Sequence, residues 1–374
     1  MIAGGGTGGH IFPGIAIADA IERQLPGTEV FFMGRRASIE ERVVKGTGRS
    51  FVPVPAMGVR RGRDVRNAAV PLVVGAGYVR SLAALARRRP SVAVGTGGFT
   101  SVPPLLAART LGIPLVLQEQ NSYPGLATRV LSQFAASVHV SFEDTKACLP
   151  RAKDVVVSGN PVRGEFLTAQ RTQARRALGL PEEGTVVFIL GGSGGAHSLN
   201  EALAAAAPRL AEARLLVIAQ TGRGDVETVR AAVKTAGIEG VVEPFFDHVA
   251  LAYAASDLLV SRAGATVIAE ITIAGKPSIL VPYPFATEGH QEKNARAMEK
   301  AGAAILVLDR DLTGSVLATT ILELVNDPKR LRGMAEQARR LARPDAADRV
   351  ARGILALAGA GSGTGRGPGG GSVR

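Results

Sequence analysis

Short apolar segments alternate along this chain with longer stretches rich in alanine and leucine. In the first half the apolar segments, rich in β-branched residues, are 29–34, 51–56, 91–98, 113–119 and 154–159. In the second half they are 185–192, 214–222, 241–246, 257–262 and 277–282. Because each segment is continuously apolar rather than alternating, we expect parallel strands covered by helices on both faces.

This pattern starts twice. The segment "IAGGGTGGH" at 2–10 is echoed by "ILGGSGGAHS" at 189–198, and each predicts a strand, a glycine loop and a helix. Strands that alternate with helices predict right-handed crossovers, and therefore an α/β protein of two doubly wound, Rossmann-like domains facing across a cleft. Asn160-Pro161 interrupts regular structure, so we place the domains at 1–161 and 162–340.

Both ends of the chain carry a prediction. Only Met1 to Ala3 precede the first glycine loop, so we expect the native chain to start a few residues earlier, without a leader peptide. Residues 359–374 are half glycine and predict a disordered tail.

No stretch of about 20 apolar residues lacks a charge, so we expect no transmembrane helix. A single cysteine favours a reducing compartment.

The charge is uneven. The formal net charge is +12, and eight arginines but one acidic residue lie between Arg60 and Arg89. Such a surplus suits a polyanion or an anionic membrane surface. Segment 70–89 places five large apolar residues near arginines, namely Leu72, Val73, Val79, Leu82 and Leu85 near Arg80 and 87–89. We expect it to insert shallowly among anionic lipids; an ordinary packed helix with a basic outer face is the alternative.

Three glycine loops follow predicted strands, at 4–9, 95–101 and 191–198. Gly4, Gly6 and Gly9 have the spacing of a dinucleotide fingerprint, but the second strand ends in Arg35 and Arg36 rather than an acid. An NADP-dependent oxidoreductase therefore stays an alternative. Glycine loops at helix N-termini offer bare backbone N–H groups to phosphates, and three of them predict more than one phosphorylated ligand.

Seven motifs in one order carry a resemblance that extends over residues 1–355. They are GGTGGHIFPG, GTGGFTSVPP, QEQNSYPG, GNPVR, GGSGGA, SRAGATVIAE and GHQEKNA. Together they closely resemble the MurG family of GT-B glycosyltransferases, which add N-acetylglucosamine to the lipid-linked muramyl-pentapeptide of peptidoglycan. Three alternatives remain: a glycolipid glucosyltransferase, a sugar-nucleotide epimerase, or a non-catalytic sugar-nucleotide-binding protein.

The resemblance implies a GT-B fold whose last helix, 341–358, crosses back to the first domain. It implies UDP-GlcNAc and undecaprenyl-pyrophosphoryl-MurNAc-pentapeptide as substrates, and no metal or other cofactor. It also implies peripheral attachment to the cytoplasmic face of the bacterial plasma membrane. Cell-wall synthesis and division proteins are implied as further partners, with roles in cell shape and division. No nucleic-acid partner is expected.

The family's binding residues carry over by motif. The resemblance implies that Ser193 contacts the donor diphosphate, Glu270 the ribose hydroxyls, Gln291 the sugar, and the Phe246 backbone the uracil edge. The full donor set is Thr7, Gly8, Gly9, Asn121, Arg163, Ser193, Phe246, Ala265, Thr266, Val267, Ile268, Ala269, Glu270 and Gln291. Acceptor loops are assigned to Gly97, Gly98, Phe99, Arg60 and Arg61. The chain departs from the family at Gly194, where a glutamine is usual.

The implied reaction is a single displacement in which the muramyl 4-hydroxyl attacks the anomeric carbon, inverting α to β. The hydroxyl must lose its proton, so a general base is needed. His10, which follows the first glycine loop and titrates near neutrality, is the first candidate, and Glu119 is the second. Asp309 and Asp311 form a DxD sequence that could hold a metal, but Asp311 fits better in the cap of a following helix.

Overall fold

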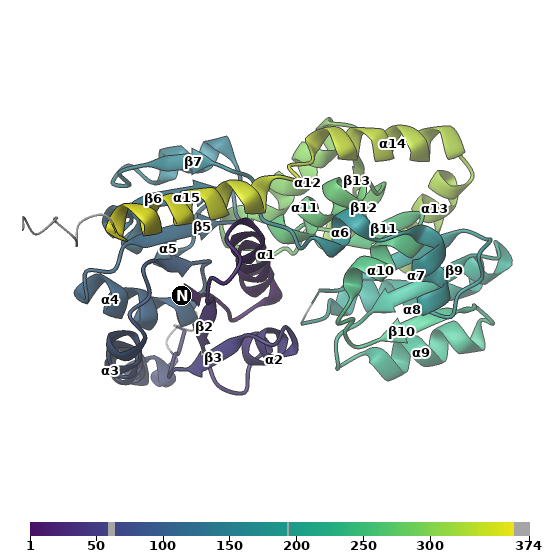
Figure 1. Cartoon of the computed structure of the whole chain (residues 1–374). Coiled ribbons are helices and arrows are strands. Elements are labelled where there is room, and N and C mark those ends of the chain that lie inside the picture. Colours follow the sequence, from purple (N-terminus) through teal and green to yellow (C-terminus); the bar gives the residue numbers. More distant parts are fainter. Residues whose placement is uncertain (59–63, 193, 363–374) are drawn as a thin grey trace, which may run out of the picture.

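The computed structural model describes residues 1–58, 64–192 and 194–362. Two parallel sheets lie beside each other, each covered by helices (Figure 1). The described part of the first domain has seven strands in the order β3-β2-β1-β4-β5-β6-β7. These strands are β1 Ile2–Ala3, β2 Phe31–Gly34, β3 Ser50–Pro53, β4 Ala93–Gly95, β5 Leu115–Glu119, β6 Ser137–Val140 and β7 Val155–Val157.

Helices cover both faces of this first sheet. One face packs against α1, α2 and α15, the other against α3, α4 and α5. Their bounds are α1 Gly8–Gln24, α2 Ile39–Gly46, α3 Val70–Arg88, α4 Val102–Thr110, α5 Leu126–Leu131 and α15 Ala346–Ser362. Strands β2 and β4 are buried along their whole length, which explains their continuous apolar sequences.

The second domain repeats this plan. Its described strands have the order β10-β9-β8-β11-β12-β13, with bounds β8 Val186–Leu190, β9 Leu216–Gln220, β10 Gly240–Glu243, β11 Leu258–Ser261, β12 Ser278–Leu280 and β13 Ala304–Leu306. Its helices are α6 Glu165–Thr168, α7 Arg171–Ala177, α8 His197–Glu212, α9 Val226–Thr235, α10 Val249–Ala255, α11 Ala265–Ala274, α12 His290–Lys300, α13 Gly314–Val325 and α14 Pro328–Leu341.

The chain passes between the domains twice. The first passage follows β7, and Phe166 on α6 already belongs to the core of the second domain. The proposed boundary at 161/162 falls within this connection. The second passage leads into α15, which lies along α1 and places Val350 and Ile354 in the core of the first domain (Figure 1). The first domain is therefore built from both ends of the chain.

Eight of the ten predicted segments contain a whole strand, and the other two, 51–56 and 241–246, contain all but the first residue of β3 and β10. The sequence analysis missed β6, in which polar and apolar residues alternate, and β13. The cap predicted at Asp311 is wrong. Asp309–Asp311 is a short 3-10 turn, and Thr313 caps α13, its Oγ1 accepting the Val316 N–H at 3.2 Å.

Helix α3 presents an unusual surface. Leu72 and Val79 are 78% and 65% exposed, while Gly77, Ser81 and Leu85 are buried. By length and composition alone the helical stretch Val65–Arg88 could cross a bilayer, contrary to the expectation from the sequence, and 17% of its apolar window is buried. Its buried face packs along α4, so the helix is part of the first domain.

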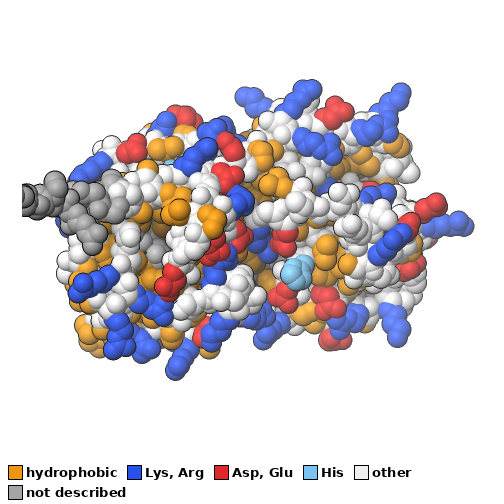
Figure 2. Space-filling model, viewed as in Figure 1, with side chains coloured by type: hydrophobic (Ala, Val, Ile, Leu, Met, Phe, Trp, Pro, Cys, Tyr) orange, Lys and Arg blue, Asp and Glu red, His pale blue; other side chains and the backbone are white. Residues whose placement is uncertain are grey.

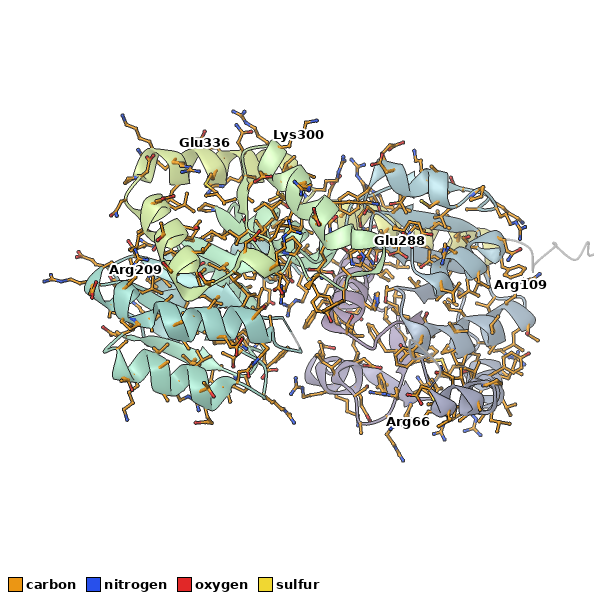
Figure 3. All side chains as sticks on the ribbon, turned by 180° about the vertical axis from the view of Figure 1, so that it is seen from behind. Arg66, Arg109, Arg209, Glu288, Lys300 and Glu336 are labelled. Carbon is orange, nitrogen blue, oxygen red and sulfur yellow. The ribbon has the colours of Figure 1, made fainter. Side chains whose placement is uncertain are left out.

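Basic side chains surround this helix and extend beyond it. Arg80 and the three arginines at 87–89 are exposed, and Arg66 projects into solvent ahead of α3 (Figure 3). On the face shown in Figure 2, Lys and Arg side chains are spread over both domains. The exposed apolar positions of α3 therefore lie within a basic surface.

Candidate active site

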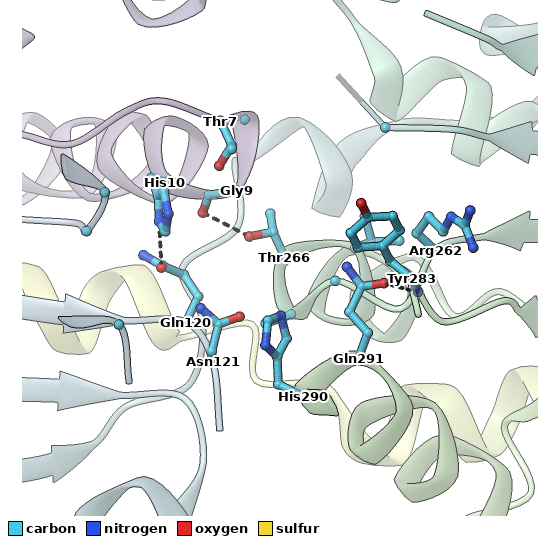
Figure 4. Close-up of a pocket in the computed structure, with 18 of the residues that line it drawn as sticks. Thr7, Gly9, His10, Gln120, Asn121, Arg262, Thr266, Tyr283, His290 and Gln291 are labelled. Atoms are coloured by element: carbon cyan, nitrogen blue, oxygen red, sulfur yellow. Dashed lines mark hydrogen bonds between the residues drawn. The ribbon is translucent and has the colours of Figure 1, made fainter. Parts of the chain in front are cut away.

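A cavity of about 1360 Å³ lies between the two domains and is lined by residues of both. It opens beyond the carboxyl ends of the parallel strands, where α/β sheets bind ligands. The first glycine loop and the β4–α4 loop border it from one side, and the start of α11 and the Tyr283 loop from the other (Figure 4). Most of the residues predicted from motifs are thus brought to one place.

His10 lies in the first turn of α1 and faces this cavity. Its Nδ1 is 3.1 Å from Oε1 of Gln120 (Figure 4). The Gln120 amide nitrogen donates to the Thr96 carbonyl at 2.7 Å and to Gln118 Oε1 at 2.5 Å, so Oε1 must be the atom that faces His10. Nδ1 therefore carries the proton, and Nε2 keeps the lone pair that a general base uses.

The β4–α4 loop fixes the imidazole from its other side. Gly97 and Gly98 have φ values of +93° and +80°, which favour glycine. A Cβ on Gly97 would lie 2.9 Å from the Nδ1 of His10, and one on Gly98 would lie 2.1 Å from the Gly5 carbonyl oxygen. These glycines let two loops and the imidazole pack together, and they line the cavity with Phe99.

Glu119, the second candidate base, has a different environment. It is buried, and its carboxylate accepts hydrogen bonds from the Asn121 backbone N–H, the Asn121 side chain, the Gly125 N–H and the Thr128 hydroxyl. Both oxygens are thus engaged in holding the loop that leads into α5. The geometry therefore favours His10 as the base and gives Glu119 a positioning role. Asn121 itself lines the cavity.

The N-terminus of α11 faces the first glycine loop. Gly264 precedes the helix, and Thr266 Oγ1 donates to the Gly9 carbonyl at 3.1 Å across the domain interface (Figure 4). An α-helix N-terminus carries a partial positive charge, so this end of α11 suits a diphosphate. Ala265, Thr266 and Val267 line the cavity together with Thr7, Gly8 and Gly9. Ile268 packs in the domain core, and neither it nor Ala269 belongs to the described lining.

Glu270 reaches the cavity from one turn further along α11. It is 6% exposed, and one carboxylate oxygen accepts the Tyr253 hydroxyl at 2.9 Å. Burial raises the pKa of the Glu270 carboxyl to about 7, although the nearby Arg163 guanidinium opposes the shift. The residue therefore changes charge near neutral pH.

Arg163 lies at the passage between the domains. Its guanidinium is 2.8 Å from Glu165 and lies over the Phe12 ring, 4.2 Å from the centroid. It is not among the described residues that line the cavity, so the expected donor contact stays a prediction. Its Nε and Nη2 atoms are buried without a hydrogen-bond partner among the described residues.

Two further predicted donor residues line the cavity and are held by neighbours. The Phe246 N–H donates to Gln220 at 3.0 Å, and Gln291 Oε1 accepts the Tyr283 N–H at 2.9 Å. Ser193, Arg60 and Arg61 lie outside the described residues.

The sequence analysis missed several cavity residues. Gln120, which orients His10, stands in the QEQN motif between two residues that were assigned. Arg262 stands in the SRAG motif and donates to Asp309 at 2.5 Å and to Ser198 at 2.9 Å. Asp309 is therefore paired with an arginine.

Among the described residues, no group of three or more His, Cys, Asp or Glu could hold a metal ion, and the expected absence of a metal stays a prediction.

Comparisons with known proteins place this site in a family. The chain matches the glycosyltransferase family 28 N-terminal domain over residues 1–140 and the family 28 C-terminal domain over residues 186–350. The fold and the site thus define a GT-B glycosyltransferase of family 28.

A relative from Desulforudis audaxviator is 42% identical over 366 residues, which is 96% of this chain and 98% of the relative. It is named UDP-N-acetylglucosamine–N-acetylmuramyl-(pentapeptide) pyrophosphoryl-undecaprenol N-acetylglucosamine transferase. The crystal structure of Acinetobacter baumannii MurG is 30% identical, with a TM-score of 0.71, and covers 95% of this chain and 98% of that one. The chain belongs to the MurG family.

A UDP-GlcNAc 2-epimerase from Neisseria meningitidis has a TM-score of 0.68 at 13% identity, over 95% of this chain and 98% of that one. At this identity the likeness shows the fold alone. Family membership therefore favours the transferase over the epimerase and oxidoreductase alternatives.

Proposed function

We propose that this enzyme transfers N-acetylglucosamine from UDP-GlcNAc to the 4-hydroxyl of undecaprenyl-pyrophosphoryl-MurNAc-pentapeptide, with inversion at the anomeric carbon. The observation that carries this proposal is the oriented His10–Gln120 pair in a cavity shared by both domains. The names of the relatives supply the two substrates. His10 Nε2 takes the proton of the hydroxyl as the new bond to the anomeric carbon forms and the bond to UDP breaks.

The departing UDP gains negative charge. The N-terminus of α11 is the group that would stabilise it, because its unpaired N–H groups and partial positive charge face the cavity. Asn121, Phe246, Glu270 and Gln291 are proposed as further donor contacts on the basis of their places in the lining. Thr266 ties this helix to the first glycine loop and so couples donor and acceptor sides.

The acceptor belongs to the first domain in this proposal. Its diphosphate would meet the loop Gly97–Phe99, where bare backbone groups precede α4. We further propose peripheral attachment to the cytoplasmic face of the plasma membrane through the exposed apolar and basic surface of α3. Contacts with cell-wall synthesis and division proteins are part of the same proposal.

The decisive experiment measures UDP release from UDP-GlcNAc with and without the lipid-linked acceptor. A transferase releases UDP quickly only when acceptor is present, and the product carries a β-linked sugar. Release without acceptor, or conversion of UDP-GlcNAc into a 2-epimer, would contradict the proposal. Binding of NADPH in a titration would instead favour the oxidoreductase. Activity should persist in EDTA, because no metal is proposed.

A further inference from the structure

Three helices of the first domain contribute apolar side chains to the lining of the cavity. Each contributes a pair spaced i, i+4, which lies on one helix face. The pairs, called here the apolar wall, are Val70 and Val74 of α3, Val102 and Leu106 of α4, and Leu126 and Val130 of α5.

None of these six side chains is fully buried, and Leu126 and Val130 are 66% and 49% exposed. Each pair thus presents apolar side chains to the cavity, and α3 and α4 pack against each other. Covering exposed aliphatic surface with an aliphatic ligand removes it from water and lowers the free energy of the complex. The wall offers no hydrogen-bonding side chain to a sugar or a peptide.

The wall begins where the acceptor diphosphate is proposed to bind. The loop Gly97–Phe99 runs through a 3-10 turn directly into α4, and Val102 and Leu106 occupy the first two turns of that helix. A group attached to the diphosphate would therefore pass over the wall as it leaves the loop.

The chemistry of that group is known for the relatives. Their names describe an acceptor sugar joined through a pyrophosphate to undecaprenol, a polyprenyl alcohol. We propose that the apolar wall binds the first isoprene units of the acceptor's polyprenyl chain, so that the enzyme recognises the lipid itself and not only the sugar and diphosphate. This inference rests on the proposed function.

The surface of α3 that faces away from the cavity allows binding of the polyprenyl chain to be tested separately from membrane attachment. Val79 is 65% exposed there, and Val65, just before α3, is 87% exposed; neither belongs to the cavity lining. The polyprenyl chain would cross the wall and then enter the bilayer beside this outer surface. Inner and outer valines can therefore be changed separately.

The test uses two soluble acceptors in the absence of vesicles and below any micelle concentration. One carries a ten-carbon prenyl group on the diphosphate and the other carries a methyl group. We expect the parent enzyme to show a kcat/KM at least tenfold higher for the prenyl acceptor, since even one methylene in an apolar pocket gives about that factor. A Val74→Thr/Val130→Thr variant should lose most of this ratio with an unchanged KM for UDP-GlcNAc.

A matched Val65→Thr/Val79→Thr variant, altered at the outer positions, should keep the ratio. Circular dichroism and Tm compare the folding of the two variants. Two results would overturn the inference. The parent enzyme could show kcat/KM values for the prenyl and methyl acceptors that agree within twofold, or the Val74→Thr/Val130→Thr variant could keep the parental ratio of these two values. If neither acceptor supports UDP release by the parent, the proposed function itself fails, and this inference fails with it.

Discussion

The proposed role of His10 as a base depends on Gln120, whose hydrogen bonds determine which imidazole nitrogen carries the proton. We expect His10→Ala to lower kcat by roughly 10²–10⁴-fold, the usual contribution of a general base, with little change in donor affinity. The acidic limb of the kcat/KM profile should disappear in the variant. Steady-state kinetics on the lipid acceptor measure both effects.

Gln120→Glu is the informative companion to that variant. It keeps the oxygen that accepts from Nδ1 but adds a negative charge beside it, which should move the acidic limb of the kcat/KM profile to higher pH. Near-parental turnover of His10→Ala would refute the assignment of the base.

Glu270 gives a prediction at the donor side. The charge-assisted hydrogen bonds to the ribose that we propose for Glu270 should contribute on the order of 1.5–3 kcal/mol, so Glu270→Ala should raise the KM for UDP-GlcNAc by about ten- to a hundredfold. Because the pKa is about 7, the parental KM should fall as pH rises through 7 and the carboxylate forms. An unchanged donor KM in the variant would defeat the assignment.

The same carboxyl affects stability with a definite sign. Between its ordinary pKa of 4.5 and the folded value of about 7, the folded state holds a proton that the unfolded chain has lost. The free energy of unfolding therefore decreases as pH rises through this range and is level above it. Glu270→Gln should remove this decrease, which urea titrations at pH 5 and pH 8 would reveal.

At the scale of elements, α3 carries a prediction about membrane attachment. Replacing Arg80, Arg87, Arg88 and Arg89 by glutamine should abolish most co-sedimentation with anionic vesicles, and salt should weaken parental binding because exposed charges are screened. The control replaces four exposed arginines of the second domain, Arg223, Arg310, Arg330 and Arg332. Equal sedimentation of both quadruple variants would mean that α3 is not the anchor.

Two strands, β8 and β6, show which elements the sequence could predict and which it could not. Strands such as β8 were predictable because parallel strands buried on both faces are continuously apolar. Strand β6 was not, since Ser137 and His139 interrupt the apolar run although both are buried.

For the site, motifs supplied the glycine loops and His10, but not their mutual contacts. The His10–Gln120 and Thr266–Gly9 hydrogen bonds join residues 110 and 257 positions apart. Such contacts follow from the packing of whole elements, which local sequence does not determine.

For the whole molecule, the important feature is the return of α15 to the first domain. Ile354 is 5% exposed in the first domain's core, so Ile354→Ala should lower stability by about 2–5 kcal/mol. Hydrogen exchange should quicken in α1 and β1, far away in sequence. Ile321→Ala, in the core of the second domain, should instead affect β8 and α8. Faster exchange confined to the second domain in the Ile354 variant would contradict this account.

The placement of α15 also has a consequence for biosynthesis. The apolar face of α1 leaves the ribosome first, but the residues that cover it, near Val350, are made last. At about 5–20 residues per second, this interval lasts on the order of 15 to 65 seconds. During that time the nascent first domain exposes a surface that chaperones recognise. A stalled chain ending before α15 should therefore be held by chaperones, and release of the finished chain should free it.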